Sequence, residues 1–431
     1  MSEYKRRKVH KKFHRQKIKP QKNEPRTEAE SQDKIIMTAV GRYGENDTET
    51  RERPLRVIKS ERRRKKHALL KSAVALLMVS GIMFLLSYVL PGGLADTAAN
   101  ILAGLGRGEY PIKLEDSMTI DVAAQGNGYY VLTSSAIYAY NANGKELFSH
   151  SHGFSSPVMT VSQSRALVFD QGGNTVSIYN LKGLKKTLTV KNKITTAAIG
   201  RNGSFAISVT GGEYTSTVYV YSKSGKNVYT WNSAKDIVNN AAVSPDGKKI
   251  ALSLLNVSSG QFTTKLEVFG FNSADPLYTA DFGEDIILSL RSNTKGVGAA
   301  CSSGYSFFTW RKYERSNFIV KDKTLNMYRI SGNTTVLAFN RESDKSDNTV
   351  IYLSASGKKI SEFAYKGTVT DMETSGGRVY FISDTKLSIY NKKGELIKSG
   401  DCDYGSERFA VTGAESAALV SDGEIKEAAV K

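Results

Sequence analysis

The stretch IYAYNANGKELF, residues 137–148, decides the fold. A short run of aromatic and apolar residues ends in a polar turn that contains Gly144, and a second such run follows the turn. Aromatic and β-branched residues favour strands. Glycine reaches the positive φ of a tight turn at little cost. The stretch therefore predicts a β-hairpin.

The same hairpin recurs along the chain. Successive turn glycines are 39 and 42 residues apart from Gly144 through Gly183 to Gly225, and 37 residues apart from Gly357 to Gly394. The interval of 132 residues from Gly225 to Gly357 accommodates three units, with weaker copies around residues 266–269 and 306–310. A repeat of about 40 residues is typical of a four-stranded β-propeller blade. The clear later copies are VSIYNLKG (176–183), VYVYSKSG (218–225), VIYLSASG (350–357) and LSIYNKKG (387–394).

Residues 110–431 hold about eight such units, so we predict an all-β, eight-bladed propeller, with seven blades as the alternative. A spare strand at 110–114 precedes the first unit. The last unit offers runs at 408–411 and 417–420 and a short strand near Ile425. We expect the two ends of the domain to join in one blade, which closes the ring and leaves no open sheet edge.

Two motifs carry resemblances to known propellers. SPDGKKIA (244–251) resembles the strand-turn-strand motif of WD40-like repeats, in which Pro245 and Asp246 start the turn and Gly247 supplies its left-handed position. The hairpin at 137–148 resembles the blade hairpin of quinoprotein-like eight-bladed propellers. Those propellers place a docking tryptophan in each blade, whereas this chain has two tryptophans, so the resemblance implies no quinone cofactor.

The whole layout is similar to a family of unknown function from Clostridia-type Gram-positive bacteria. Its members combine a basic N-terminus and one spanning helix with a divergent propeller. The resemblance implies a membrane-anchored domain and no activity.

Residues 73–90 carry no charged side chain, and we predict a transmembrane helix over 68–90. About 20 apolar residues in a helix cross the hydrocarbon core of a bilayer. The following Pro-Gly-Gly is expected to end the helix and begin a juxtamembrane linker, 91–109. A cleaved signal peptide and a buried helix of a globular domain are the alternatives. The residues expected to contact lipid are Ala73, Leu76, Leu77, Met78, Val79, Ile82, Phe84, Leu85, Leu86 and Leu90.

Most of the positive charge precedes this helix. Of a net charge of +18, residues 1–71 contribute +13, from 23 Lys and Arg against 10 Asp and Glu. Basic residues beside a spanning helix stay on the cytoplasmic side, so we expect a cytoplasmic N-terminus and an extracellular propeller in the cell membrane. The residues expected to set this topology and to contact anionic lipid are Arg62, Arg63, Arg64, Lys65, Lys66 and Lys71.

The segment 1–67 has few apolar residues and predicts a disordered cytoplasmic tail. Its basic clusters lie at 5–22 and 51–66. Attraction to anionic lipid is one functional interpretation and contact with nucleic acid is another, beside a plain topology signal. Of the two partners, we expect lipid and not nucleic acid.

No catalytic or metal-binding constellation emerges from the sequence. His150 and His152 share a strand face but lack a third ligand nearby. The acidic stretch 342–347 contains a lysine and no closing glutamate, so we expect a solvated loop and not a calcium site. Cys301 and Cys402 could pair or remain two free thiols. We predict no cofactor, no metal and no enzymatic activity.

The predicted function is a membrane-anchored surface protein whose propeller is a non-catalytic binding or scaffold module. Its partner is expected to be an extracellular or cell-wall protein or glycan. The alternatives are a transmembrane sensor with a ligand-binding propeller and a membrane-tethered propeller enzyme.

Overall fold

A computed structural model describes the chain from residue 61 onward. Gaps in the description are 91, 116–117, 259, 302, 332–333, 384, 403–407, 422 and 431, and the side chains of 61–69, 87–89 and 429 are also outside it. The predicted disordered tail therefore lies outside the described residues up to residue 60.

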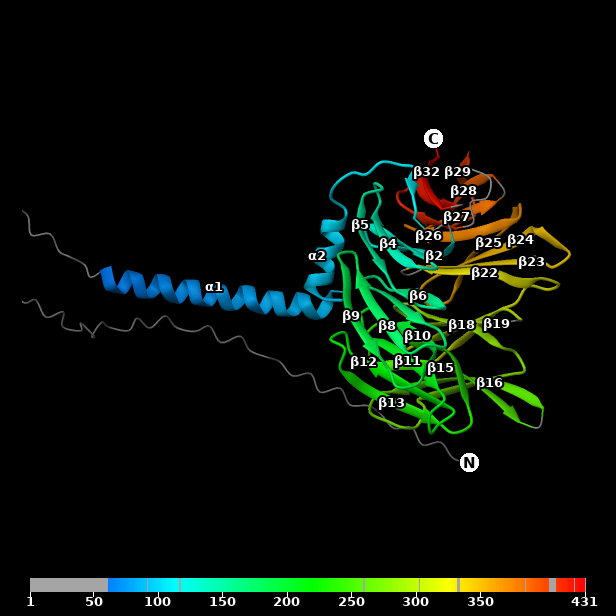
Figure 1. Ribbon diagram of the computed structural model, residues 1–431, viewed down its shortest axis with the longest axis horizontal. Coiled ribbons are helices and arrows are strands. Elements are labelled where there is room, and N and C mark those ends of the chain that lie inside the picture. Colours follow the sequence, from blue (N-terminus) through cyan, green and yellow to red (C-terminus); the bar gives the residue numbers. More distant parts are fainter. Residues whose placement is uncertain are drawn as a thin grey trace, which may run out of the picture. The chain divides into compact units, whose positions relative to one another are not determined.

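In the described part of the chain, two helices precede the strands: α1 (Glu61–Val89) and α2 (Leu94–Ala103) (Figure 1). α1 begins seven residues before the predicted start at 68, so residues 61–67 are helical and the disordered assignment is wrong there. Glutamate, arginine, lysine and alanine in this stretch are good helix formers. α2 lies within the predicted linker 91–109, which the sequence analysis left without structure.

In the described part of the chain, neither helix satisfies both the length and the mean hydropathy that a membrane span requires. The residues predicted to span the membrane, 68–90, form most of α1, and Leu90 directly follows this helix.

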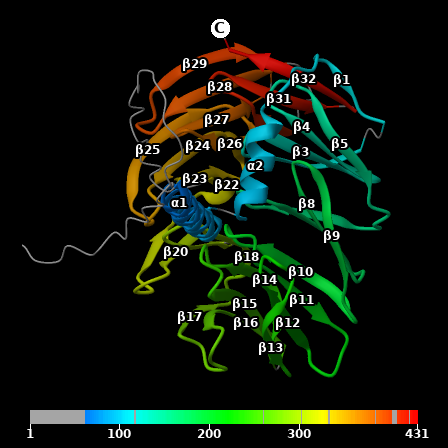
Figure 2. The ribbon, with the colours of Figure 1, turned by 90° about the vertical axis from the view of Figure 1, so that its left-hand side faces the viewer.

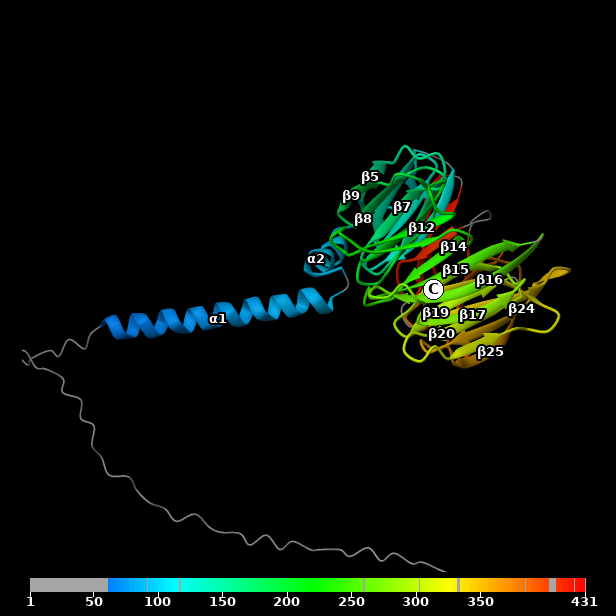
Figure 3. The same ribbon diagram turned by 90° about the horizontal axis from the view of Figure 1, so that it is seen from below.

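Among the described residues, 32 strands form eight antiparallel sheets of four strands each. Within seven sheets the strands pair in chain order, and the sheets follow one another around a ring, as the sequence of colours in Figure 2 shows. Figure 3 shows the ring from a third direction. The prediction of an all-β propeller with eight blades is confirmed, and the seven-bladed alternative is wrong.

Each blade has a first strand next to the channel and three further strands outside it. The first strands of blades 1 to 8 are β2 (Thr119–Gln125), β6 (Pro157–Val161), β10 (Lys193–Ile199), β14 (Ile237–Val243), β18 (Ile287–Ser292), β22 (Thr324–Ser331), β26 (Val369–Ser375) and β30 (Arg408–Val411). The second strands are β3 (Gly128–Thr133), β7 (Ala166–Asp170), β11 (Phe205–Thr210), β15 (Lys249–Ser258), β19 (Gly296–Cys301), β23 (Thr334–Arg341), β27 (Arg378–Ser383) and β31 (Ser416–Ser421).

The outer half of each blade is a hairpin of the third and fourth strands. The third strands are β4 (Ala136–Asn141), β8 (Thr175–Asn180), β12 (Ser216–Tyr221), β16 (Gln261–Gly270), β20 (Tyr305–Thr309), β24 (Asp344–Leu353), β28 (Lys386–Asn391) and β32 (Glu424–Ala429). The fourth strands are β5 (Glu146–Ser151), β9 (Gly183–Thr189), β13 (Asn227–Ser233), β17 (Tyr278–Gly283), β21 (Arg315–Phe318), β25 (Lys359–Lys366), β29 (Leu396–Asp401) and β1 (Ile112–Lys113).

The eighth blade joins the two ends of the domain. Its strand order is β1-β32-β31-β30, and Ile112 and Lys113 pair with Ile425 and Glu424. The first strand of the domain thus completes the last blade, as the spare strand at 110–114 predicts. No blade depends on another molecule to complete its sheet.

The core consists of eight apolar clusters, one at each boundary between neighbouring blades. The second strand of blade 1 shows how this arises, because successive side chains of a strand point to opposite faces. Tyr129 and Val131 pack toward blade 8, whereas Tyr130 and Leu132 pack toward blade 2. The second strand of each blade is therefore buried on both faces. This burial holds the first strand of each blade in a fixed position around the channel.

Candidate binding site in the central channel

The first strands share a local irregularity that shapes the channel wall. In six of the eight blades, one residue of the first strand is left out of the pairing with the second strand, which is a β-bulge. A bulge bends the strand and re-aims the side chains that follow it. The residues left out are Ile120, Thr195, Asn239, Leu288, Asn326 and Thr370.

A cavity of about 740 Å³ occupies the channel on the side where α2 lies. Residues from all eight blades line it, together with Thr97 and Asn100 of α2 and Leu90 before it. Its volume is in the range of pockets that hold small ligands. A second cavity of about 220 Å³ lies among the first strands of blades 2 to 6. Arg291 lines both cavities and so lies between them.

A charged cluster forms where blades 6 and 7 meet the channel. The Arg329 guanidinium donates to a carboxylate oxygen of Asp371 and, at 3.0 Å, to Oε1 of Glu373. The backbone N–H groups of Met372 and Phe409 also donate to Asp371, at 2.9 and 3.3 Å. The Asp371 side chain is 2% exposed. This carboxylate is thus held by partners from three blades.

Burial controls the protonation of these carboxyl groups. It raises the pKa of Glu373 to about 7, and the positive charge of Arg329 opposes the rise. Burial also raises the pKa of Asp371 and of Asp121 on β2, again against the pull of neighbouring arginines. Glu373 is therefore a group whose charge changes near neutral pH.

Arg291 extends from blade 5 to blade 2. Its Nη1 donates to the Thr160 hydroxyl at 2.9 Å, although the two residues lie 131 positions apart in the sequence. The charge of Arg291 is also the largest influence that lowers the pKa of Asp121, against the larger effect of burial. Arg291 thus connects the charged side of the channel with the side formed by blades 2 to 4.

The wall formed by blades 2 to 4 carries mostly uncharged polar groups, together with Arg201 at the cavity of about 740 Å³. Asn239 and Asn240 of β14 donate to the backbone oxygen of Ile287 at 2.9 and 3.2 Å, and Thr195 donates to Ser208 O at 3.2 Å. These bonds fix the bulged segments. The channel therefore offers both ionic and uncharged polar groups to a ligand that carries both ionic and hydrogen-bonding groups.

α2 lies at the mouth of the channel, over blades 1 and 2 (Figure 2). Asp96, 1% exposed, accepts from Arg165 Nε at 2.7 Å and from Asn180 Nδ2 at 2.9 Å. Asn100 donates to Gln163 O at 3.2 Å and accepts from Asn127 at its backbone oxygen at 3.0 Å. These polar contacts attach α2 to the turns of two blades.

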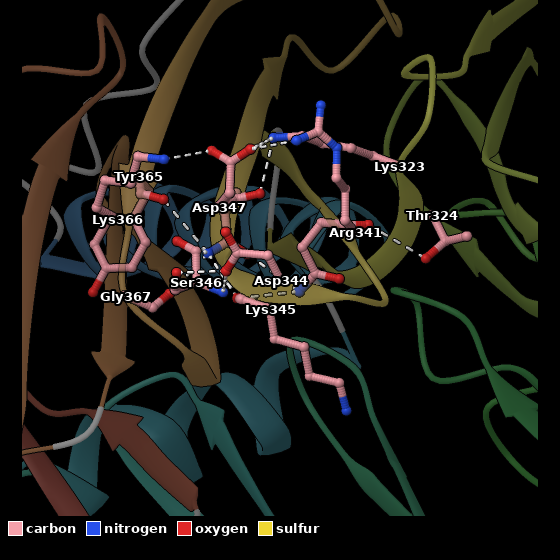
Figure 4. A network of polar contacts seen from close by, with 12 residues as sticks. Lys323, Thr324, Arg341, Asp344, Lys345, Ser346, Asp347, Tyr365, Lys366 and Gly367 are labelled. Carbon is pink, nitrogen blue, oxygen red and sulfur yellow. Dashed lines mark hydrogen bonds and ion pairs between the residues drawn. The ribbon is translucent and has the colours of Figure 1, made fainter.

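The acidic stretch 342–347 forms an ion-pair network (Figure 4). Asp347 contacts Lys366 at 2.8 Å, Lys323 at 2.9 Å and Arg341 at 3.8 Å. The hydrogen bonds from Lys366 and Lys323 lower the pKa of Asp347 to about 2. Asp344 accepts from the hydroxyl and the backbone N–H of Ser346. Lysine and arginine thus surround Asp347.

The other candidates for chemistry have ordinary partners. His150 Nδ1 bonds the Tyr179 hydroxyl at 3.0 Å, and His152 Nδ1 accepts from Phe154 N at 3.0 Å. Within the described residues, no three His, Cys, Asp or Glu side chains gather as a metal site would require. Cys301 and Cys402 are free thiols, and burial raises the pKa of Cys301 to about 12.

The turn residues named in the sequence analysis lie on the rim of the ring and not in the channel, except Pro245, which lines the mouth. Asp246 accepts from Ser244 Oγ at 2.6 Å within its turn. The turn glycines have positive φ: Gly144 (78°), Gly183 (121°), Gly225 (82°), Gly247 (66°), Gly357 (72°) and Gly394 (84°).

The residues predicted to anchor the chain are on α1, except Leu90, which lines the mouth of the channel. Arg62 to Lys66 occupy the first turns of α1 without described side chains, and Lys71 is exposed.

Residues 109–429 match a family described as a family of unknown function, DUF5711. The chain belongs to the DUF5711 family. No curated protein matches it. Among solved structures, this DUF5711 chain is similar to the Dos1 propeller, with 13% identity and a TM-score of 0.52 over 75% of this chain and 94% of that one.

The C-terminal WD40 domain of Sif2 is similar at 11% identity, with a TM-score of 0.50 over 74% of this chain and 99% of that one. BamB from Moraxella catarrhalis is similar at 13% identity, with a TM-score of 0.46 over 75% of this chain and 96% of that one. At these identities the Dos1 and Sif2 likenesses show the propeller fold alone.

The sequence analysis missed the channel cluster. Asp121, Arg291, Arg329 and Glu373 come from four blades and share no local motif. The only signal is the position of these residues relative to the bulge of their strand. Asp121 directly follows its bulge residue, and Arg291, Arg329 and Glu373 are the third residue after theirs. Aligning the first strands at their bulges would place Arg291, Arg329 and Glu373 in equivalent positions and Asp121 two residues earlier, aligned with Asp371.

Proposed function

We propose that the protein is a membrane-anchored binding module in which α1 crosses the bilayer and the channel of the propeller holds the ligand. The observation that supports anchoring is the surface of α1. Eleven large apolar side chains of this helix are 41–75% exposed, on all of its sides. Each apolar side chain left in water forgoes roughly 1.5–3 kcal/mol of transfer free energy, and lipid would cover them all. They are Leu70, Val74, Leu76, Leu77, Met78, Val79, Ile82, Met83, Phe84, Leu85 and Leu86.

The charge distribution supports an outward orientation of the propeller. Arg62 to Lys66 precede the apolar part of α1, whereas residues 91–106 contain no Lys or Arg. The positive-inside rule then puts the N-terminus in the cytoplasm and the propeller outside. The ring binds an extracellular protein or glycan and performs no catalysis.

The channel supports the binding role. Its cavity of about 740 Å³ is lined by three arginines and two carboxylates, which are Arg201, Arg291, Arg329, Asp121 and Glu373. A ligand with both charges and hydroxyl groups, such as a charged glycan fragment, can form ion pairs and hydrogen bonds with these side chains.

Membrane fractionation tests the anchor. The full chain, expressed in cells, should sediment with membranes and stay there after extraction at alkaline pH. A variant with Leu77→Lys and Phe84→Lys on α1 should appear in the supernatant. The matched control, Leu184→Lys and Leu396→Lys on the exposed rim, should sediment like the parent chain. Recovery of the parent chain in the supernatant would contradict the anchor.

A binding assay tests the channel. The full chain in detergent, applied to an array of charged glycans, should retain at least one class. Arg291→Ala combined with Glu373→Ala should lose it, whereas Lys191→Ala and Lys321→Ala on the rim should not. Equal retention by both variants would exclude the channel as the site.

A further inference from the structure

The turns of the ring lie on two opposite faces. In an antiparallel meander, the turns between first and second strands and between third and fourth strands lie at the same end of the blade. The turns between second and third strands and the connections between blades lie at the other end. Asn100 of α2 bonds Gln163, in the turn between β6 and β7. We call the face that carries these turns the α2 face, and the other the distal face.

The α2 face is basic. Its turns contain thirteen Lys and Arg against five Asp and Glu among the described residues, whereas the distal turns and connections contain four against seven. The hairpins between third and fourth strands contribute most, and six of the seven hairpins in blades 1 to 7 present exposed basic side chains. These are Lys145, Lys182, Lys223, Lys226, Arg311, Lys312, Lys358, Lys392 and Lys393.

α2 adds an apolar surface to the same face. The helix buries Asp96, Ala99 and Ala103 against the ring. On its other side Ile101 is 62% exposed and Leu102 49%, and Leu105, directly after the helix, is 62% exposed. A short helix with apolar residues outward, beside exposed lysines, is typical of segments that lie in the interface of a membrane.

The chain connectivity keeps this face near the end of α1. Four residues, 90–93, separate Val89 from Leu94. Since each residue spans at most about 3.6 Å, the ends of the two helices lie within about 18 Å of each other. Gly92 and Gly93 are buried against the ring.

We propose that the α2 face lies against an anionic phospholipid bilayer, with Ile101, Leu102 and Leu105 inserted among the acyl chains and the hairpin lysines on lipid phosphates. This inference rests on the proposed function, because α1 brings the face to the membrane. Each basic residue near an anionic surface strengthens association by about fivefold. The ring thereby presents its distal face to protein partners.

Amine labelling of the full chain in nanodiscs tests the inference. The chain is reconstituted into discs of phosphatidylcholine alone or with phosphatidylglycerol, and lysine acetylation rates are measured by mass spectrometry. In phosphatidylglycerol discs, acetylation of Lys182, Lys226 and Lys358 should slow by about fivefold. Lys191, Lys235 and Lys321, exposed on the distal face, are the internal controls and should react equally in both discs.

Charge reversal provides matched variants. The triple variant Lys182→Glu, Lys226→Glu and Lys358→Glu should abolish the lipid-dependent protection of the remaining basic residues on the α2 face, such as Lys145 and Lys393. The triple variant Lys191→Glu, Lys235→Glu and Lys321→Glu changes the net charge equally and should leave that protection intact. Both sets replace exposed lysines, so folding of the ring is preserved in each.

Three outcomes would overturn the inference. If the chain enters the discs but both lysine sets react alike, the ring does not rest on lipid although the anchor holds. If soluble polyphosphate protects the lysines and phosphatidylglycerol does not, the face binds a polyanionic polymer. If the chain does not enter discs at all, the anchor itself is wrong and the inference falls with it.

Discussion

Arg291 Nη1 donates to the Thr160 hydroxyl at 2.9 Å across the channel, from the fifth blade to the second. Three blade boundaries separate the two residues around the ring, so this bond is a direct link between its two halves.

A double-mutant cycle measures this link. Arg291→Met and Thr160→Val should each lower the free energy of unfolding by about 1 kcal/mol, because each removes one partner of the bond. The loss of unfolding free energy in the double variant should be about 1 kcal/mol smaller than the sum of the two single losses. The measurement is urea unfolding of the full chain in detergent, and strictly additive costs would show that the two side chains do not interact in solution.

Arg329→Met should lower the free energy of unfolding by about 3–5 kcal/mol, because it leaves the buried Asp371 carboxylate without its cation. Adding Asp371→Asn and Glu373→Gln to this variant should recover part of the loss. Arg311→Met, at an exposed turn, should change stability by less than about 0.5 kcal/mol. Equal losses for Arg329→Met and Arg311→Met would contradict the buried cluster.

Glu373→Gln should reduce the pH dependence of stability between about pH 4.5 and 7. The pKa of Glu373 is raised to about 7 in the folded chain, so in this window the folded state binds more protons than the unfolded state. Stability conferred by the protonated carboxyl is therefore complete below about pH 4.5 and is lost as the pH rises through 7, by at most about 3 kcal/mol.

Thermal unfolding at several pH values checks this. Asp347 has the opposite sign, because its pKa is lowered to about 2 and its contribution is lost as the pH falls toward 2. Asp347→Asn should therefore lower stability at neutral pH, and this loss should disappear as the pH falls toward 2. An unchanged slope in Glu373→Gln above pH 5 would refute the assignment.

Asp96→Ala should release α2 without unfolding the ring. The substitution leaves Arg165 and Asn180 without their shared acceptor, and the cost is limited to the free energy that docks α2. Hydrogen exchange should accelerate in residues 94–103 and stay unchanged in the second strands. Glu109→Ala, at an exposed neighbour, is the control. Global destabilisation by Asp96→Ala would show instead that α2 and the ring unfold together.

Gly144→Ala and Gly172→Ala separate backbone strain from packing. Both glycines have φ near 80°, so each alanine should cost about 1–2 kcal/mol of stability. A Cβ on Gly144 would also lie 2.8 Å from Cε2 of Tyr110, beside the closing strand, whereas Gly172 has open space. Gly144→Ala should therefore cost about 1 kcal/mol more in urea unfolding. Equal costs would contradict the packing of Tyr110 on this turn.

The repeat and its turns predict the ring because each hairpin is encoded within about a dozen consecutive residues. Closure is also predictable, since the spare strand at 110–114 lacks a partner nearby. The channel is different, because Asp121 and Glu373 lie 252 positions apart and line the same cavity only when all blades are stacked. The first strands mix polar and apolar residues, whereas the second strands are continuously apolar.

α2 escaped prediction for a similar reason. Its ten residues, LADTAANILA, follow Pro91-Gly92-Gly93, which end one helix and gave no sign of another. The helix depends on Arg165 and Asn180 of blade 2 for the partners of Asp96, and those contacts are long-range. Such a short helix is marginal in isolation, so tertiary contacts decide its existence.

The pairing of β1 with β32 also sets an order of events on the ribosome. Seven blades can form from consecutive residues as they emerge, but β1 has no partner until residues 424–429 have been synthesised. A premature stop upstream of them would leave both β1 and β31 with unpaired edges, which invite pairing with other chains. Proteases that recognise open strands could thus distinguish truncated from full translation products.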